Sequence, residues 1–207
     1  MKTLITPMIL VLTIILTSCE VDVKVDSSKS SNNEITFFTK DSIKIYGNLF
    51  STSKDNPVIL LFHQGRSNGR GEYKDIIPVL TKKEFNVLVI DQRSGGQLYG
   101  NYNRTILQFE VNSYSYCDAY ADLEGALDYI IDSGYSGKKI VWGSSYSASL
   151  AILLASNRPA DISAVLAFSP ASGAATPMSV PLLDLSRQHA SLHDEFARAF
   201  IDGADKP

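Results

Sequence analysis

Mostly apolar runs alternate along this chain with segments whose apolar residues recur at helical spacing. The apolar runs span residues 57–62, 85–91, 138–142 and 162–168, and the helical patterns span about 73–83, 117–131 and the residues after 145. The run at 57–62 is apolar throughout, which is typical of a strand covered on both faces, and the alternation of strands with helices favours parallel pairing. The pattern therefore predicts an α/β fold, a mostly parallel sheet with flanking helices.

The segment around Ser145 combines a strand, a sharp turn and a helix. The apolar run stops at Gly143, Ser145 follows, and a helical segment rich in small residues comes next. The letters G-x-S-x-S are close to the G-x-S-x-G nucleophile elbow, in which small residues such as Gly143 and Ser147 let strand and helix approach. The pattern predicts Ser145 as a catalytic nucleophile; a strand, turn and helix without chemistry is the alternative.

The helix after Ser145 adds an electrostatic argument. The first N–H groups of a helix have no acceptor within it, and the helix dipole places partial positive charge there. The backbone N–H of Tyr146 is therefore predicted to donate to the oxygen that becomes negative during acyl transfer.

The order of motifs resembles that of a known superfamily. An H-Q-G loop at residues 63–65, D-x-R-x-G-G at 91–96, a helical pattern and then G-x-S-x-S resemble the α/β hydrolases, and most of all the serine hydrolases grouped with dienelactone hydrolases and serine aminopeptidases. The resemblance covers about residues 34–170, taken as a partial hydrolase domain. It implies that antiparallel strands at 34–40 and 42–50 open the fold, and that the Gln64 N–H completes the oxyanion hole.

Two titratable residues at strand ends invite a catalytic interpretation. By the resemblance, the side chain of His63 supports the loop that carries Gln64, and a role as general base is the alternative. Asp91 is interpreted as ordering the turn at residues 93–96, with a role as the triad acid as the alternative.

The remaining triad residues are not found in the sequence. In α/β hydrolases the acid and then the histidine follow the serine along the chain. Beyond residue 170 no further buried strand is predicted, so the sheet is expected to lack its last strands. His189 and His193 lie four residues apart in an amphipathic helical pattern. Because two histidines without a third ligand are weak support for a metal site, we expect a solvated helix face and no metal.

Residues 171–207 look like a divergent or foreign tail, partly helical. From about Met178 they resemble the N-terminus of the DegT/DnrJ/EryC1 aminotransferases, a short match that carries over no pyridoxal phosphate chemistry. We therefore expect a C-terminally truncated hydrolase joined to another sequence. The other interpretation is a short member of the superfamily with a divergent end.

The N-terminus predicts a bacterial lipoprotein. The apolar stretch at residues 4–16 is too short to span a bilayer and suits a signal peptide, which ends in a lipobox-like Leu-Thr-Ser-Cys. Residues 1–19 are thus a signal peptide with lipidation at Cys19, and a plain secretory signal is the alternative. The polar residues 20–33 are expected to form a flexible tether to the membrane surface. We expect a lipid-anchored protein of the cell envelope, facing the periplasm or the exterior.

The net charge and the motifs of the sequence limit the kinds of ligand and partner that we expect. The formal net charge is −3, which gives no basic footprint for nucleic acid. The glycine-rich residues 65–71 match no nucleotide-binding fingerprint, and we expect no cofactor. Two functions remain: a serine hydrolase that acts through Ser145 on an ester or another small acyl substrate, or a non-catalytic, truncated hydrolase-like envelope lipoprotein.

Overall fold

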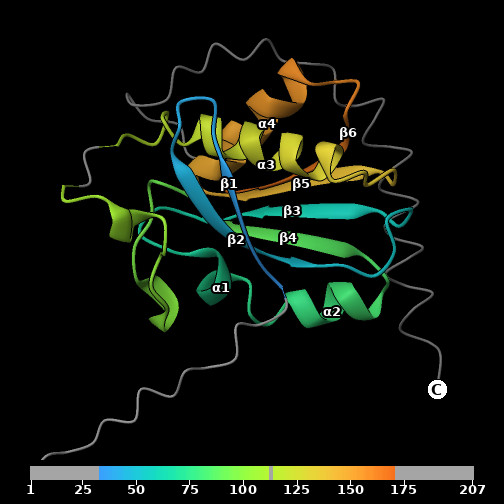
Figure 1. The fold of residues 1–207 in the computed structure, drawn as a ribbon, viewed down its shortest axis with the longest axis horizontal. Helices are drawn as coiled ribbons and strands as arrows, with labels where there is room; N and C mark the ends of the chain where they lie inside the picture. The colour runs from blue at the N-terminus through green and yellow to red at the C-terminus, as the bar shows by residue number, and fades with distance from the viewer. Residues whose placement is uncertain (1–32, 112–113, 171–207) are drawn as a thin grey trace, which may run out of the picture.

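The computed structural model describes residues 33–111 and 114–170, which form a six-stranded sheet flanked by helices (Figure 1). The strands are β1 (Glu34–Phe38), β2 (Lys44–Phe50), β3 (Val58–Phe62), β4 (Asn86–Asp91), β5 (Lys139–Ser144) and β6 (Ile162–Phe168). The longer helices are α3 (Tyr120–Asp132) and α4 (Tyr146–Asn157), and shorter ones are α1 (Gly69–Glu72), α2 (Ile77–Lys82) and the 3₁₀ turns η1 (Leu98–Gly100) and η2 (Ile106–Gln108). The strand order is β1-β2-β4-β3-β5-β6.

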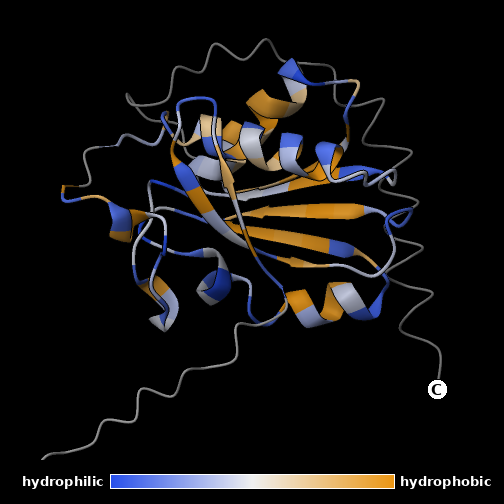
Figure 2. Cartoon of the chain, viewed as in Figure 1, coloured by the Kyte–Doolittle hydropathy of each residue, from blue (hydrophilic) through white to orange (hydrophobic). Residues whose placement is uncertain are grey.

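The apolar runs form the centre of the sheet. Strands β3 and β4 are buried along their whole length, and both are uniformly hydrophobic in Figure 2 except at the ends of β4. Strands β3 to β6 pair in parallel, whereas β1 and β2 pair antiparallel and join the sheet through β4. The predicted fold class, a mostly parallel sheet with flanking helices, is confirmed.

Helices cover both faces of the sheet (Figure 1). On one face α3 and α4 enclose the larger core with residues such as Leu60, Leu88 and Leu127. On the other face α2 and the segment before it cover a smaller core that includes Leu61 and Val89. The alternation of side chains along each strand sends neighbouring residues into these two cores.

The helix predicted over about 73–83 is wrong in its first part. The structure has two short helices, α1 and α2, separated by a turn. The side chain of Asn68 caps α1 by accepting from the Gly71 N–H at 2.7 Å, which starts that helix earlier than its apolar pattern. Pro78 stands in the first turn of α2, where a missing N–H costs no intrahelical hydrogen bond.

The tail lies outside the described residues, as do the signal peptide with Cys19 and the tether apart from Asn33. Strand β6 is therefore the last described strand, at one end of the sheet, and Phe168 at its end is half exposed. Within residues 33–111 and 114–170, none of the helices combines the length and apolar character needed to cross a bilayer.

Candidate active site

Ser145 stands at a sharp turn between β5 and α4. Its backbone has φ 57° and ψ −121°, in a region that L-residues rarely adopt. Its N–H donates to the carbonyl of Phe168 at 2.9 Å, which ties the turn to the neighbouring strand β6. The residue is half-buried, so the turn presents the serine at the carboxyl edge of the sheet without enclosing it completely.

The small residues on either side of Ser145 have different tasks. A Cβ atom at Gly143 would lie 2.3 Å from the Ser147 carbonyl oxygen, so only glycine allows the helix to approach the strand. Ser147 is fully buried, and its hydroxyl donates to the carbonyl of His63 at 2.6 Å. The serine that replaces the second glycine of the elbow pattern therefore joins α4 to the end of β3.

His63 has both ring nitrogens engaged in the protein interior. Its Nε2 accepts from the Gln92 N–H at 2.9 Å, and its Nδ1 lies 2.8 Å from the Gln64 carbonyl oxygen. This pair of partners requires the neutral tautomer with the proton on Nδ1. Burial lowers the pKa of His63 further below its usual range. The geometry fits the supporting role and leaves the imidazole without a free nitrogen for Ser145.

The structure gives the Gln64 N–H an acceptor other than a substrate. That N–H donates to the carboxylate of Glu72 at 3.0 Å. In a planar trans peptide the N–H and the preceding C=O point in opposite directions. Because the His63 carbonyl accepts from Ser147 in α4, the Gln64 N–H points away from that part of the helix. A role for Gln64 in the oxyanion hole requires Glu72 to leave and the peptide to reorient.

The next peptide along the loop has a different orientation. The Gln64 carbonyl faces the ring of His63, so the Gly65 N–H points away from that ring. A Cβ atom at Gly65 would lie 2.6 Å from the hydroxyl of Tyr116, and the Tyr116 ring stacks on Tyr146 at 4.4 Å between centroids. The two N–H groups of this loop therefore differ in direction, and the H-Q-G motif alone gives no signal for either direction.

Tyr146 is fixed by its buried side chain. Its hydroxyl donates to the Ser94 carbonyl at 3.2 Å and accepts from Gln92 Nε2 at 2.9 Å. Burial raises the pKa of Tyr146 well above its usual value, which keeps the phenol neutral. These contacts anchor the first residue of α4, whose N–H is the predicted oxyanion donor.

Asp91 has a different structural role from the one expected. It accepts from the Gly69 N–H at 3.0 Å and from Arg104 Nε at 2.7 Å, so it holds α1 and the loop after η1. The turn at residues 93–96 is instead held by Asp122 of α3, which accepts from the Arg93 N–H at 2.7 Å. The expectation that Asp91 orders this turn is wrong.

Neither a second imidazole nor a metal cluster stands in the described part of the chain. His63 is its one histidine, because His189 and His193 lie outside the described residues. No group of three or more His, Cys, Asp or Glu side chains within residues 33–111 and 114–170 is arranged to hold a metal ion. The described residues therefore supply the turn at Ser145 and backbone donors, but no general base.

The solved structures that this chain resembles include esterases and an α/β hydrolase. An esterase from Pyrococcus furiosus, Pf2001, superimposes with a TM-score of 0.52 at 26% identity over 66% of this chain and 50% of its own. The α/β hydrolase GrgF from Penicillium sp. sh18 gives 0.56 at 17% identity over 82% and 55%. Est1E from Butyrivibrio proteoclasticus, solved with ferulic acid bound, gives 0.53 at 18% over 66% and 52%.

The comparisons establish the α/β-hydrolase fold. No protein-family model matches the sequence, and no curated protein is significantly similar to it. The chain spans about half the length of the solved structures it resembles.

Proposed function

We propose that the protein is a serine hydrolase that acts on an ester or another small acyl substrate, with Ser145 Oγ as its nucleophile. The observation that carries this proposal is the backbone of Ser145, held at φ 57° between β5 and α4 in an α/β-hydrolase fold. A strained conformation at a non-glycine residue persists only where the surroundings fix it, and such positions cluster at active sites. The esterases among the similar structures support the same reaction class.

In this proposal Ser145 Oγ attacks the substrate carbonyl carbon. The new Oγ–C bond forms as the carbonyl π bond opens, and the serine proton passes to a general base. The Tyr146 N–H donates to the resulting oxyanion. The predicted second donor is the Gln64 N–H, after Glu72 has left and the peptide has reoriented, and the Gly65 N–H is the alternative. Collapse of the intermediate expels the alcohol with the proton from the base, and water then releases the acyl group.

The base must come from outside the described residues, because His63 has no free nitrogen. In the given sequence, His189 and His193 are imidazoles outside the described residues. Without a base, the serine stays close to its unperturbed hydroxyl pKa and reacts weakly. Substitution of each histidine in turn by alanine distinguishes a base from a bystander, because loss of the base lowers kcat by several orders of magnitude.

A fluorophosphonate probe tests the nucleophile directly on the full chain. We expect labelling of the wild type, no labelling of Ser145→Ala, and unchanged labelling of Ser144→Ala, a matched substitution one residue earlier. Circular dichroism confirms that each variant is folded. A folded wild type that does not label contradicts the proposal and favours the non-catalytic envelope lipoprotein.

We also propose that the chain is attached to the bacterial cell envelope through a lipid at Cys19, with residues 20–33 as tether. The lipobox-like residues 16–19 support this proposal. Metabolic labelling with a palmitate analogue is expected to mark the wild type and to spare Cys19→Ser, while Cys117→Ser labels normally. Equal labelling of wild type and Cys19→Ser contradicts the anchor.

A further inference from the structure

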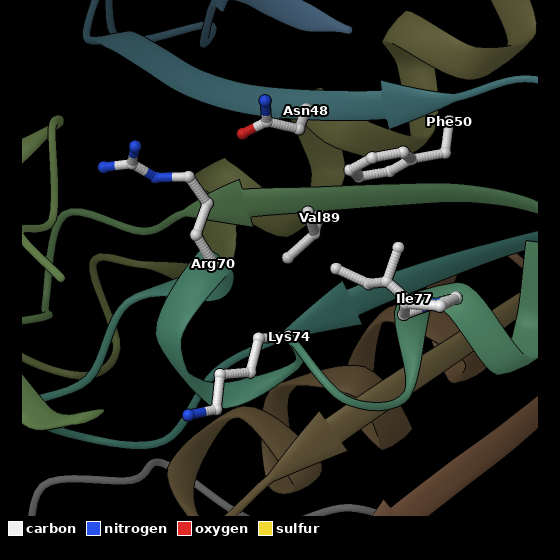
Figure 3. Close-up of a pocket in the computed structure, with 7 residues that line it drawn as sticks. Asn48, Phe50, Arg70, Lys74, Ile77 and Val89 are labelled. Carbon is white, nitrogen blue, oxygen red and sulfur yellow. The ribbon is translucent and has the colours of Figure 1, made fainter. Parts of the chain in front are cut away.

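The cavity on the α2 face of the sheet has no charged group directed at its apolar lining. Its volume is about 240 Å³, and Phe50, Ile77 and Val89 form part of the lining (Figure 3). The guanidinium of Arg70 and the ammonium of Lys74 point away from these side chains and from each other, so they cannot hold one ligand together (Figure 3). The aromatic side chains beside the turn at Ser145 form a more specific arrangement.

Tyr116 lies against both backbone segments of the candidate active site. Its ring stacks on that of Tyr146, the residue after Ser145, with 4.4 Å between the centroids and 18° between the planes. Its hydroxyl edge faces the loop after β3, since a Cβ atom at Gly65 would lie 2.6 Å from the Tyr116 hydroxyl oxygen. Tyr116 therefore bridges the start of α4 and the loop that are predicted to supply the oxyanion donors.

One face of the Tyr116 ring is open to solvent. Tyr146 covers one face and Gly65 covers the hydroxyl edge, yet Tyr116 is 41% exposed. A flat ring with one face and one edge covered exposes its opposite face. The Tyr146 ring beneath is buried and is anchored by hydrogen bonds to the Ser94 carbonyl and to Gln92, so it supports Tyr116 rigidly.

A second tyrosine borders the same loop. The Tyr99 hydroxyl accepts from Gln64 Nε2 at 2.7 Å, and half of the Tyr99 side chain is exposed. The backbone of Tyr99 has φ 66°, in the left-handed region that a bulky residue rarely adopts, so its surroundings must hold it there. Two successive residues of the loop, Gln64 and Gly65, thus each meet a half-exposed tyrosine, and this side of the candidate site is aromatic.

We propose that the candidate active site takes esters that carry an aryl group, and that Tyr116 is a specificity-determining residue whose open face stacks on this group. Aromatic pairs attract each other beyond the area that they bury, because the negative face of one ring favours the positive edge of another. The aryl group can belong to the acyl part or to the alcohol part of the ester. This role of Tyr116 rests on the proposed hydrolase function, because it takes Ser145 as the centre of the site.

Amide NMR of the full-length Ser145→Ala protein measures binding without turnover. The ligands are ethyl benzoate, its isomer phenyl propanoate, and ethyl cyclohexanecarboxylate, whose saturated ring has a similar size but no π system. We expect the aryl esters to shift the amide signals of Gly65 and Tyr146, and the stronger binder of the two isomers identifies the part of the ester that carries the aryl group. Nuclear Overhauser contacts between the aryl protons and the Tyr116 ring locate the ligand directly.

Substitution of Tyr116 should change the preference between the two kinds of ring. The Kd of the saturated ester divided by the Kd of the better aryl ester should fall about threefold to tenfold when Tyr116→Leu is added to Ser145→Ala, because the aromatic pair is lost. Tyr116→Phe should keep this ratio. Tyr102→Leu should also keep it, because it removes another exposed tyrosine from the segment between β4 and α3.

Two results would overturn this role of Tyr116. One is an unchanged ratio of dissociation constants in Tyr116→Leu, with circular dichroism showing that the variant is folded. The other, which needs no substitution of Tyr116, is the absence of Overhauser contacts between the aryl protons and its ring. Fluorophosphonate labelling of the wild type tests the hydrolase separately. Aryl binding at Tyr116 in a chain that does not label supports the aryl site and contradicts the reaction, whereas labelling without aryl binding contradicts the aryl site alone.

Discussion

Two buried polar clusters lie behind the carboxyl edge of the sheet, and they fix their loops by different physical means. The neutral cluster consists of His63, Gln92, Tyr146 and Ser147. The charged cluster consists of Asp41, Arg93 and Asp122. The first supports the turn at Ser145, and the second holds the loop after β4 against α3 and the β1–β2 turn.

The neutral cluster depends on hydrogen bonds between uncharged groups, and within the described residues only Gln92 Oε1 among its buried side-chain polar atoms has no partner. Gln92 is at its centre, because its N–H binds His63 and its Nε2 donates to Ser147 Oγ at 2.7 Å as well as to Tyr146. Such hydrogen bonds add about 1 kcal/mol each, but an orphaned buried partner costs more. His63 must therefore stay neutral, because a proton on its Nε2 would leave the Gln92 N–H without an acceptor.

The charged cluster depends on ion pairing around a guanidinium that is only 1% exposed. Arg93 Nη2 lies 2.7 Å from Asp122, and Arg93 Nη1 binds the half-exposed Asp41. These two carboxylates raise the pKa of Arg93 above its already high value, although burial opposes them. The comparison shows that polar groups are buried here either as neutral hydrogen-bond partners or as paired opposite charges. The first arrangement is sensitive to the loss of a donor or acceptor, and the second to the loss of one charge.

Removal of the guanidinium should have the largest effect. Arg93→Met leaves Asp122 buried without its ion-pair partner, and breaking a buried pair costs about 3–5 kcal/mol. Urea unfolding followed by circular dichroism measures the loss. The double variant Arg93→Met/Asp122→Asn should recover part of it, because the amide is neutral and still accepts from the residue 93 N–H. An Arg93→Met protein as stable as Arg66→Met contradicts this view of the charged cluster.

Loss of the imidazole should cost somewhat less. His63→Phe keeps a ring of similar size but leaves the Gln92 N–H without an acceptor, so we expect a loss of about 2–3 kcal/mol in the free energy of unfolding. Fluorophosphonate labelling of this variant should fall without disappearing, since Ser145 is retained. Complete loss of labelling in a folded variant would instead place His63 in the chemistry.

The two clusters should also differ in their response to pH. Burial lowers the pKa of His63 from its ordinary value of 6.5, so the unfolded chain binds more protons than the folded one below that pH. Its contribution is present above pH 6.5 and is lost as the pH falls, by at most about 1.4 kcal/mol per pH unit. Denaturation of wild type and His63→Phe from pH 7.5 to 6 tests this, and parallel curves would contradict it.

The charged cluster was not predicted from the sequence, and the reason is physical. Asp122 stands in a helical pattern where a carboxylate usually faces solvent. Its burial depends on Arg93, which comes from another strand end 29 residues earlier. The strand at 162–168 and the turn at Ser145 follow from local patterns, and the structure has both where they were expected.

The orientation of the loop after β3 could not be predicted from the sequence either. The motif H-Q-G predicts a loop with backbone donors, but the direction of the Gln64 N–H is set by the hydrogen bond between Ser147 and the His63 carbonyl. Those two residues are 84 positions apart, and no local pattern relates them. Contacts of this kind explain why element positions were predictable while the donors of the site were not.

The smallest effect is expected at the exposed edge of the charged cluster. Hydrogen bonding to Arg93 lowers the pKa of Asp41 well below its ordinary value of 3.8. A depressed carboxyl pKa stabilises the fold above the unfolded value, and that stability is lost as the pH falls below about 4. Because Asp41 is half exposed, Asp41→Asn should cost only about 1 kcal/mol at pH 7. The cost should shrink toward zero in acid, and Asp75→Asn on the surface should show neither effect. A difference between Asp41→Asn and wild type that is the same at pH 7 and pH 3 would show that the charge of Asp41 is not what stabilises Arg93.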